Sequence, residues 1–331
     1  MNKRKLFKNS TIALLAFTLF TIHACKQEKK KEAESEAMEE AKPETTEPYF
    51  KLSLAQWSLH KAILQDSLDP YTFAEKAKGW GFSGLEYVSA LYYKELQAAN
   101  FSEEAMANFV AKSNAEAAKH GMKNLLIMVD NQGDLAVSDE KERNTTVENH
   151  KKWVDAAAAM GCHAIRVNLN GETDPEKWKK NSIDGLTKLA TYAKDKNINV
   201  IVENHGGLSS NGALHAEVME AVNMDNCGTL PDFGNFCITR KKDSRDCEEE
   251  YDGYKGVTEL MPYAKAVSAK SNDFDAEGNE VKIDYVRMLQ IVKDAGYTGY
   301  IGVEYEGSEL GEEEGIIATR DLMLKAAEEM K

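Results

Sequence analysis

Short apolar, β-branched runs alternate with longer helical patterns eight times along this chain of 331 residues. Apolar strands of this kind are typical of a parallel sheet that helices cover. We therefore predict an α/β fold in which eight parallel strands close into a (β/α)8 barrel. An open, doubly wound sheet is the alternative, but no glycine-rich turn follows the first strand. We expect strands at residues 51–57, 84–88, 122–129, 164–169, 199–205, 229–232, 264–270 and 300–304.

The helical patterns carry their own start and stop signals. Ser102 stands before an acidic first turn, and glycines at 121 and 161 follow two of the patterns directly. Residues of these types favour the beginning and the end of a helix, respectively. After the helix that follows Pro70, we expect helices at residues 102–120, up to 160, 175–196, 212–222, 248–261, 283–295 and 312–330.

Residues 1–24 are predicted to be a lipoprotein signal peptide. Four basic residues precede an apolar run from Ile12 to Ile22, which is too short to span a membrane. Ala24 stands directly before Cys25, as in bacterial lipoproteins; an ordinary signal peptide with an incidental cysteine is the alternative. Lipid on Cys25 would anchor the exported chain to a membrane on the periplasmic or cell-surface side. Residues 25–48 are expected to form a disordered tether, and residues 49–331 the barrel.

The charge of the chain limits its partners. The formal net charge is -14, and it becomes -18 once the four basic residues of the leader are removed. Phosphate backbones and anionic headgroups would repel such a body, so we expect no nucleic-acid partner and membrane contact only through the lipid anchor. Cys237 and Cys247 could pair in an oxidising compartment, although we favour free, partly buried thiols.

The strands of the second half end on polar or charged residues. Glu203, Asp232, Lys270 and Glu304 all stand at or near a strand end. In a closed parallel barrel these ends meet at one mouth, where the carboxylates would converge. Because like charges repel, such a cluster needs a cation or a proton. The pattern predicts an oxygen-rich site for a divalent metal.

Several motifs at these positions resemble the xylose isomerase-like TIM barrels. This family is often called sugar phosphate isomerase/epimerase and also includes dehydratases and endonuclease IV. The resemblance runs from about residue 52 to the C-terminus. It rests on Gln56-Trp57-Ser58, Gly81-Phe-Ser-Gly84-Leu-Glu86, Val202-Glu203-Asn-His205, Asp232-Phe-Gly-Asn235 and Gly302-Val-Glu304.

The resemblance implies a set of metal ligands. Members usually bind one divalent ion through Glu, Asp, His and Glu after strands five to eight, which corresponds to Glu203, Asp232 and Glu304 here. Ser268 stands where the histidine is expected, and the Asp-x-x-His of many relatives ends on Asn235. Ser268 would then be a weak or water-mediated ligand. An oxygen-only set favours Mg²⁺ or Mn²⁺, with Co²⁺ and Zn²⁺ as alternatives.

The same resemblance implies roles in catalysis and binding. Glu203 and Glu304 are the expected acid and base, with His205 and Lys270 as further catalytic candidates. His150 and His215 fall in helical patterns and are assigned to the surface. Substrate-binding candidates are Trp57, His60, Glu86, Arg166, Asn168 and Asn235.

The chemistry of such a site is proton transfer at a carbon next to a carbonyl. A metal that holds a carbonyl and a neighbouring hydroxyl stabilises an enediolate, and two carboxylates then move the proton. We therefore expect a metal-dependent sugar isomerase or epimerase of carbohydrate metabolism. A keto-sugar lyase or hydratase that uses the same metal site, and a non-catalytic sugar-binding lipoprotein, are the alternatives. Phosphorylated sugars are mainly cytoplasmic, so the export signal favours a free sugar or keto-sugar.

Overall fold

The computed structural model describes residues 47–244 and 246–330. The predicted signal peptide, Cys25 and the tether up to residue 46 lie outside the described residues. Eight strands form one parallel sheet in the order β6-β5-β4-β3-β2-β1-β10-β9. They are β1 (Lys51–Ala55), β2 (Gly84–Val88), β3 (Lys123–Met128), β4 (Ala164–Val167), β5 (Asn199–Glu203), β6 (Cys227–Leu230), β9 (Val267–Ser271) and β10 (Tyr300–Tyr305).

The two ends of this sheet meet, which closes the barrel. Parallel bridges join Thr229 to Ala264 and Asp232 to Ser268, between β6 and β9. The Ser268 amide donates to the Pro231 carbonyl at 2.9 Å, and the Phe233 amide donates to the Ser268 carbonyl at 3.1 Å. The predicted closed eight-stranded barrel is confirmed.

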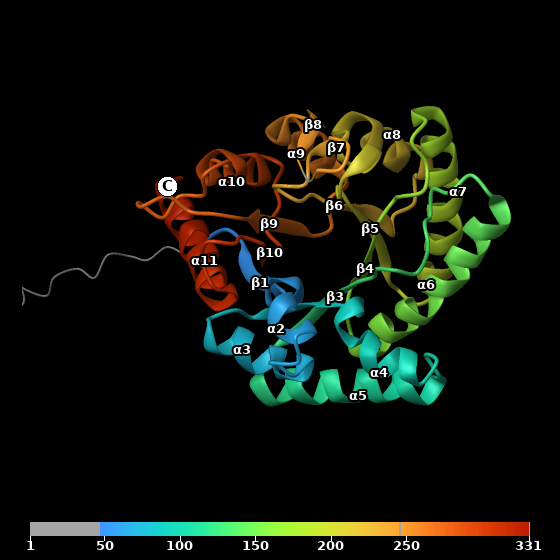
Figure 1. Ribbon diagram of the computed structural model, residues 1–331, viewed down its shortest axis with the longest axis horizontal. Coiled ribbons are helices and arrows are strands. Elements are labelled where there is room, and N and C mark those ends of the chain that lie inside the picture. The colour runs from blue at the N-terminus through green and yellow to red at the C-terminus, as the bar shows by residue number, and fades with distance from the viewer. Residues whose placement is uncertain (1–46, 245, 331) are drawn as a thin grey trace, which may run out of the picture. The chain divides into compact units, whose positions relative to one another are not determined.

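Helices surround the strands as an outer ring (Figure 1). Ser102 caps its helix as expected, since its side chain accepts from the Ala105 amide, and the Asp139 side chain accepts from the Glu142 amide at the start of α6. No helix among the described residues has the length and apolar character needed to cross a membrane. The main helices are α3 (Phe73–Gly79), α5 (Glu103–His120), α6 (Glu140–Met160), α7 (Pro175–Lys194), α8 (Gly212–Val222), α9 (Gly253–Leu260), α10 (Tyr285–Asp294) and α11 (Glu312–Glu329), with short α2 (His60–Leu64) and α4 (Tyr93–Ala98).

The apolar core lies between the strands and the helix ring. Leu54, Leu126 and Val303 on the strands are fully buried, as are Trp153 of α6 and Trp178 of α7. The strands also carry buried polar or charged residues, which include Ser53, Glu86, Arg166, Glu203, Ser268, Lys270 and Glu304.

A two-stranded antiparallel hairpin interrupts the alternation after β6. It consists of β7 (Cys237–Arg240) and β8 (Cys247–Glu250), and a disulfide joins Cys237 to Cys247 with their Cα atoms 5.6 Å apart. The prediction of free thiols at these positions was therefore wrong, as was that of a helix from residue 248. The hairpin carries residues 247–250, and α9 begins only after Asp252, whose side chain caps the Lys255 amide.

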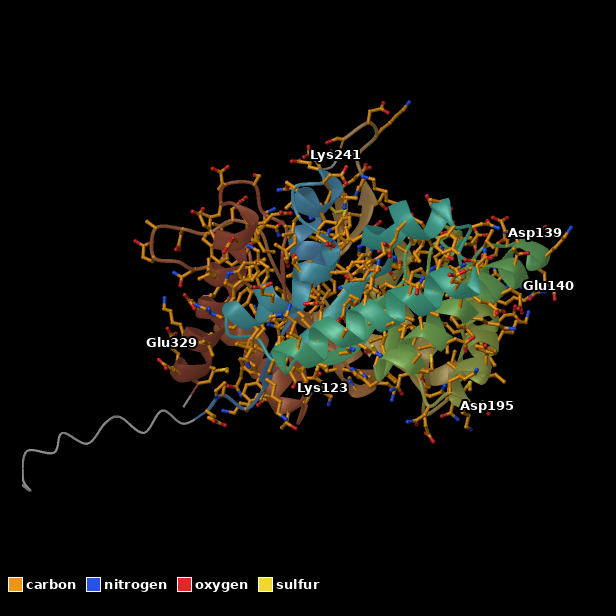
Figure 2. All side chains as sticks on the ribbon, turned by 90° about the horizontal axis from the view of Figure 1, so that it is seen from below. Lys123, Asp139, Glu140, Asp195, Lys241 and Glu329 are labelled. Atoms are coloured by element: carbon orange, nitrogen blue, oxygen red, sulfur yellow. A yellow bond between two sulfur atoms is a disulfide. The ribbon has the colours of Figure 1, made fainter. Side chains whose placement is uncertain are left out.

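The hairpin marks the end of the barrel at which the strands finish. Figure 2 shows Lys241 at its tip, which projects beyond the barrel at the end opposite Lys123. Lys123 is the first residue of β3, so the hairpin rises from the C-terminal mouth.

Candidate functional site

Three carboxylates converge at the mouth. Glu203 is the last residue of β5, Asp232 follows β6, and Glu304 lies near the end of β10. One oxygen of each lies within 4.8 Å of the others, and all three residues are buried. The predicted meeting of these strand-end carboxylates is therefore present.

Ser268 lies between two of these carboxylates. It pairs with Asp232 across the barrel closure and with Gly302 in the β9–β10 ladder. Its hydroxyl is 2.7 Å from Asp232 Oδ2 and 3.1 Å from Glu304 Oε2. A hydroxyl carries one proton, so it donates to one of the two oxygens at a time. Ser268 thus offers an oxygen at the place where the resemblance predicts a weak ligand.

Two buried cations flank the cluster. Lys270 Nζ is 3.2 Å from Glu304 Oε2 and 3.1 Å from Glu306 Oε1, and only 3% of its side chain is exposed. Arg166 Nε lies 2.8 Å from Glu203 Oε2, although the N–H does not point along a good hydrogen-bond direction. Each cation therefore neutralises part of the negative charge of the cluster.

Burial and charge act against each other within this group. Burial raises the pKa of Asp232 to about 8, since the attraction of Lys270 only partly offsets it. Burial by itself would lower the pKa of Lys270, but the carboxylate of Glu304 and its neighbours raise it well above the ordinary value. Lys270 is therefore an ammonium ion, while burial favours the protonated form of Asp232 when no other cation is bound.

Hydrogen bonds fix the orientation of the remaining groups. Asn235 Nδ2 donates to Glu203 Oε1 at 3.0 Å, and the Asn235 amide donates to Asp232 Oδ1 at 2.9 Å. Arg166 Nη1 donates to Asp130 Oδ1 at 2.7 Å, and Asn168 Nδ2 donates to the same oxygen at 2.9 Å. Arg166 thus links the carboxylate cluster to a separate acid, Asp130.

A cavity of about 990 Å³ opens at the mouth beside the cluster. Glu304 and Glu306 line it on one side, and the segment that follows β3 lines it on another. This volume lies at the upper end of the range of about 300–1,000 Å³ that is usual for small-molecule sites. The lining residues include Trp57, His60, Asp130, His150, Arg166, Asn168, His205, Glu304 and Glu306.

The structure brings most of the predicted substrate residues to this cavity. Trp57 and His60 stack with ring centroids 4.4 Å apart and line it together. Arg166, Asn168 and the exposed His205 also line it. Their roles in binding stay predictions.

The two helical histidines do not lie on the surface, as the sequence analysis expected. His150 is 2% exposed and His215 is fully buried, because each packs inward from its helix and bonds a backbone carbonyl. Two other acids were missed. Asp130 follows the third strand, so the argument that strand ends meet at the barrel mouth could have found it. Glu306 stands two residues after Glu304.

Glu86 does not line the cavity. It lies inside the barrel, where the Ser53 hydroxyl donates to Oε1 at 2.6 Å and Oε2 has no hydrogen-bond partner. Gly302 makes room for it, since a Cβ there would lie 2.5 Å from Glu86 Oε2. Burial raises the pKa of Glu86 to about 8, and the nearby charges of Glu304 and Glu203 raise it further than Arg166 lowers it. We interpret Glu86 as a neutral acid beneath the site.

The residues present fit a divalent metal. The three carboxylates and the Ser268 hydroxyl form an oxygen-only donor set, which suits hard cations. Glu203 Oε2 is buried without a hydrogen bond and so keeps lone pairs for a cation. The arrangement could hold a divalent metal, with Lys270 beside it.

Comparison with known proteins identifies the architecture. The family described as "Xylose isomerase-like TIM barrel" matches residues 74–326. An L-ribulose 3-epimerase structure superposes with a TM-score of 0.63 at 15% identity, covering 85% of this chain and 95% of its own. The IOLI protein with a zinc atom gives 0.60 at 17% identity, covering 85% and 99%. A magnesium complex from Mycobacterium smegmatis gives 0.57 at 15% identity, covering 85% and 97%. No protein of curated function matches the chain.

The buried acid Glu86 predicts a pH-dependent stability. Its pKa is raised from 4.5 to about 8 on folding, so its contribution to stability is complete below about pH 4.5 and is lost as the pH rises towards 8. In metal-free protein, Glu86→Gln should remove part of this loss, which amounts to at most about 1.4 kcal/mol per pH unit.

Urea unfolding of both proteins between pH 5 and 8.5 measures this effect. The difference between the unfolding free energies of wild type and Glu86→Gln at each pH isolates the contribution of Glu86. The contribution of Asp232, whose pKa is raised into the same range, cancels in that difference. Glu220→Gln, an exposed acid on α8, is the control and should follow the wild-type curve. Parallel curves for wild type and Glu86→Gln would show that Glu86 is ionised in the folded protein.

Proposed function

The chain belongs to the xylose isomerase-like TIM barrel family, and we propose that it is a metal-dependent isomerase or epimerase of a free sugar or keto-sugar. One observation carries the proposal: Glu304 lines the cavity and also lies within the cluster of three carboxylates. A base that opens to the substrate space and adjoins a metal site suits proton removal next to a carbonyl. The solved structures of similar fold include an L-ribulose 3-epimerase and a D-tagatose 3-epimerase-like protein.

The side chains divide the work of proton transfer. A divalent ion held by Glu203, Asp232 and Glu304 would supply Lewis acidity towards a carbonyl and its neighbouring hydroxyl. Glu304 removes the proton from the carbon that bears this hydroxyl, next to the carbonyl, and Glu203 returns a proton. The Lys270 ammonium, 3.2 Å from Glu304, stabilises negative charge that develops beside it. Return to the same carbon from the other face gives epimerisation, and return to the neighbouring carbon gives isomerisation.

The electrostatics of the cavity favour a substrate without phosphate. Asp130, Glu304 and Glu306 line it and would repel a phosphate group. Arg166 is already paired with Asp130 and Glu203, and Lys61 at the rim donates to the Gly307 carbonyl at 3.0 Å. A neutral polyhydroxylated ligand meets no such repulsion.

A lyase or hydratase is the second candidate. His205 is exposed at the cavity and close enough to Asp130 to interact with its charge. An accessible imidazole beside a carboxylate can protonate a departing hydroxyl. Loss of water from a keto-sugar would then follow the same initial proton removal.

A test in D₂O separates these reactions. We expect the metal-loaded protein to introduce deuterium at carbon into a member of a keto-sugar panel, without loss of water from its mass. Glu304→Gln should lower that exchange about 100-fold or more, because it removes the base while keeping the shape. Glu309→Gln, an exposed acid in the loop after β10, should leave it unchanged.

Two other results would contradict the isomerase assignment, and a third would contradict the role of Glu304. Loss or gain of water would assign the protein to the lyases and hydratases. Full activity of Glu304→Gln would place the base elsewhere. No exchange with any sugar, with metal bound, would favour the non-catalytic sugar-binding lipoprotein.

Ser268 should set the metal preference. We expect Ser268→His to tighten metal binding, and more for Zn²⁺ than for Mg²⁺, because imidazole suits the softer ion. Isothermal titration of both metals measures the change. Ser67→His, which adds a histidine to the exposed surface, controls for non-specific zinc binding. An unchanged Zn²⁺ to Mg²⁺ ratio would show that Ser268 does not adjoin the ion.

We also propose that the chain is an exported lipoprotein anchored through Cys25. The lipoprotein pattern around Cys25 supports this, as does the Cys237–Cys247 disulfide, since such bonds persist in oxidising compartments. Cys25→Ser should abolish lipid labelling and release the protein into the soluble fraction. Retention of unlabelled Cys25→Ser protein in the membrane would show that another anchor holds the chain.

A further inference from the structure

The cavity has a second polar region away from the carboxylate cluster. It is formed by the segment after β3 and by α6, and it includes Asp130 and His150. In the closed strand order, β3 stands four places from β9, which carries Ser268 and Lys270, so the two regions come from opposite sides of the barrel. The proton-transfer scheme uses neither Asp130 nor His150.

His150 presents a hydrogen-bond acceptor to this region. Its Nδ1 lies 2.7 Å from the Thr146 carbonyl, and a carbonyl only accepts, so Nδ1 carries a proton. Burial lowers the pKa of His150 to about 4, which leaves the ring neutral and Nε2 without a proton. No described residue donates to Nε2, although the ring lines the cavity.

Asp130 presents a second acceptor. Its Oδ1 receives both Arg166 and Asn168, whereas Oδ2 has no hydrogen-bond partner among the described residues. Burial would raise the pKa of Asp130, but the Arg166 guanidinium lowers it below the ordinary value, so the group is an anion. An ionised carboxylate only accepts hydrogen bonds.

We propose that His150 and Asp130 form a hydroxyl-binding subsite, which receives the end of the sugar remote from its carbonyl. Two acceptors without protons require a ligand that supplies donors, and the hydroxyl groups of a sugar chain do so. A terminal phosphate offers few donors and is repelled by Asp130. A terminal ammonium is disfavoured by Arg166, whose guanidinium is 2.7 Å from Asp130 Oδ1.

Arg166 sets the relation between the two regions. Its Nε lies beside Glu203 in the carboxylate cluster, and its Nη1 bonds Asp130 in the subsite. One rigid guanidinium therefore holds the subsite at a fixed offset from the cluster. A sugar whose carbonyl lies at the cluster would extend its later carbons towards Asp130 and His150, so chain length should decide affinity.

The chain provides a matched control for His150. His215 of α8 is likewise buried, its Nδ1 lies 3.0 Å from the Ser209 carbonyl, and burial lowers its pKa to about 4. It packs edge-on against Trp178 and does not line the cavity. Replacing each histidine by phenylalanine removes the same ring nitrogens, but only one replacement reaches the subsite.

This inference rests on the proposed function, and ligand binding tests it separately from activity. Isothermal titration of the Mg²⁺-loaded protein would use a ketohexose panel and the four-carbon ketose erythrulose, which has the carbonyl end without the remote carbons. His150→Phe should weaken ketohexose binding about 10-fold and leave erythrulose binding unchanged. His150→Gln, which restores an acceptor oxygen, should recover most of the loss, and His215→Phe should change neither affinity.

The outcomes distinguish the subsite from the function. If wild type binds ketohexoses and His150→Phe binds them equally well, or weakens both sugars alike, the subsite is wrong while the proposed function stands. A preference for ketohexose 6-phosphates over free ketohexoses would also overturn the subsite. If wild type binds no ketose at all, both the subsite and the proposed function are wrong. Thermal unfolding of the two phenylalanine variants establishes that each is folded.

Discussion

The mutual repulsion of buried carboxylates at the barrel mouth is the constraint on which this structure depends. Glu203, Asp232 and Glu304 bring oxygens within 4.8 Å of one another, and all three residues are buried. Two buried cations reduce that repulsion, the ammonium of Lys270 and the guanidinium of Arg166, and burial shifts Asp232 towards its protonated form. Acids still outnumber cations around the cluster, since Asp130 and Glu306 add to the three. A divalent ion would displace a proton from Asp232 and offset more of the remaining negative charge.

The same residues lie where the barrel closes. β6 and β9 are joined by isolated bridges rather than by a continuous ladder, and one bridge pairs Asp232 with Ser268. The Ser268 hydroxyl then connects Asp232 to Glu304 on the neighbouring strand. A cation held by Asp232 and Glu304 would therefore strengthen the least paired junction of the sheet. A metal bound by these carboxylates would therefore couple its binding to the closure of the barrel.

The sequence predicted the barrel and the carboxylate cluster because both follow from local periodicity and strand ends. Parallel closure places every strand end at one mouth, so Glu203, Asp232 and Glu304 had to meet once the fold was known. Asp130 follows β3 and obeys the same argument, but it was missed. Glu86 does not end its strand: it is the middle residue of β2, and its side chain points into the barrel at Gly302, a direction that depends on register.

Other features depend on contacts that a sequence pattern does not contain. The 237–250 hairpin has no apolar alternation, and its register is held by the Cys237–Cys247 disulfide and by the Tyr251 amide bonded to the Phe236 carbonyl. His150 and His215 were assigned to the surface because both fall in helical patterns. Each is buried because a carbonyl of its own helix region satisfies Nδ1. A sequence pattern does not show that a backbone carbonyl bonds the ring nitrogen of a buried histidine.

The central claim is that the cluster binds a divalent cation beside the built-in lysine. Anomalous diffraction from a crystal of the protein soaked in Mn²⁺ tests it most directly. The account predicts one strong anomalous peak at about 2.0–2.6 Å from oxygens of Glu203, Asp232 and Glu304, with Lys270 still bonded to Glu306. Mn²⁺ bound only elsewhere, with Lys270 and Arg166 as the sole cations at the three carboxylates, would contradict it.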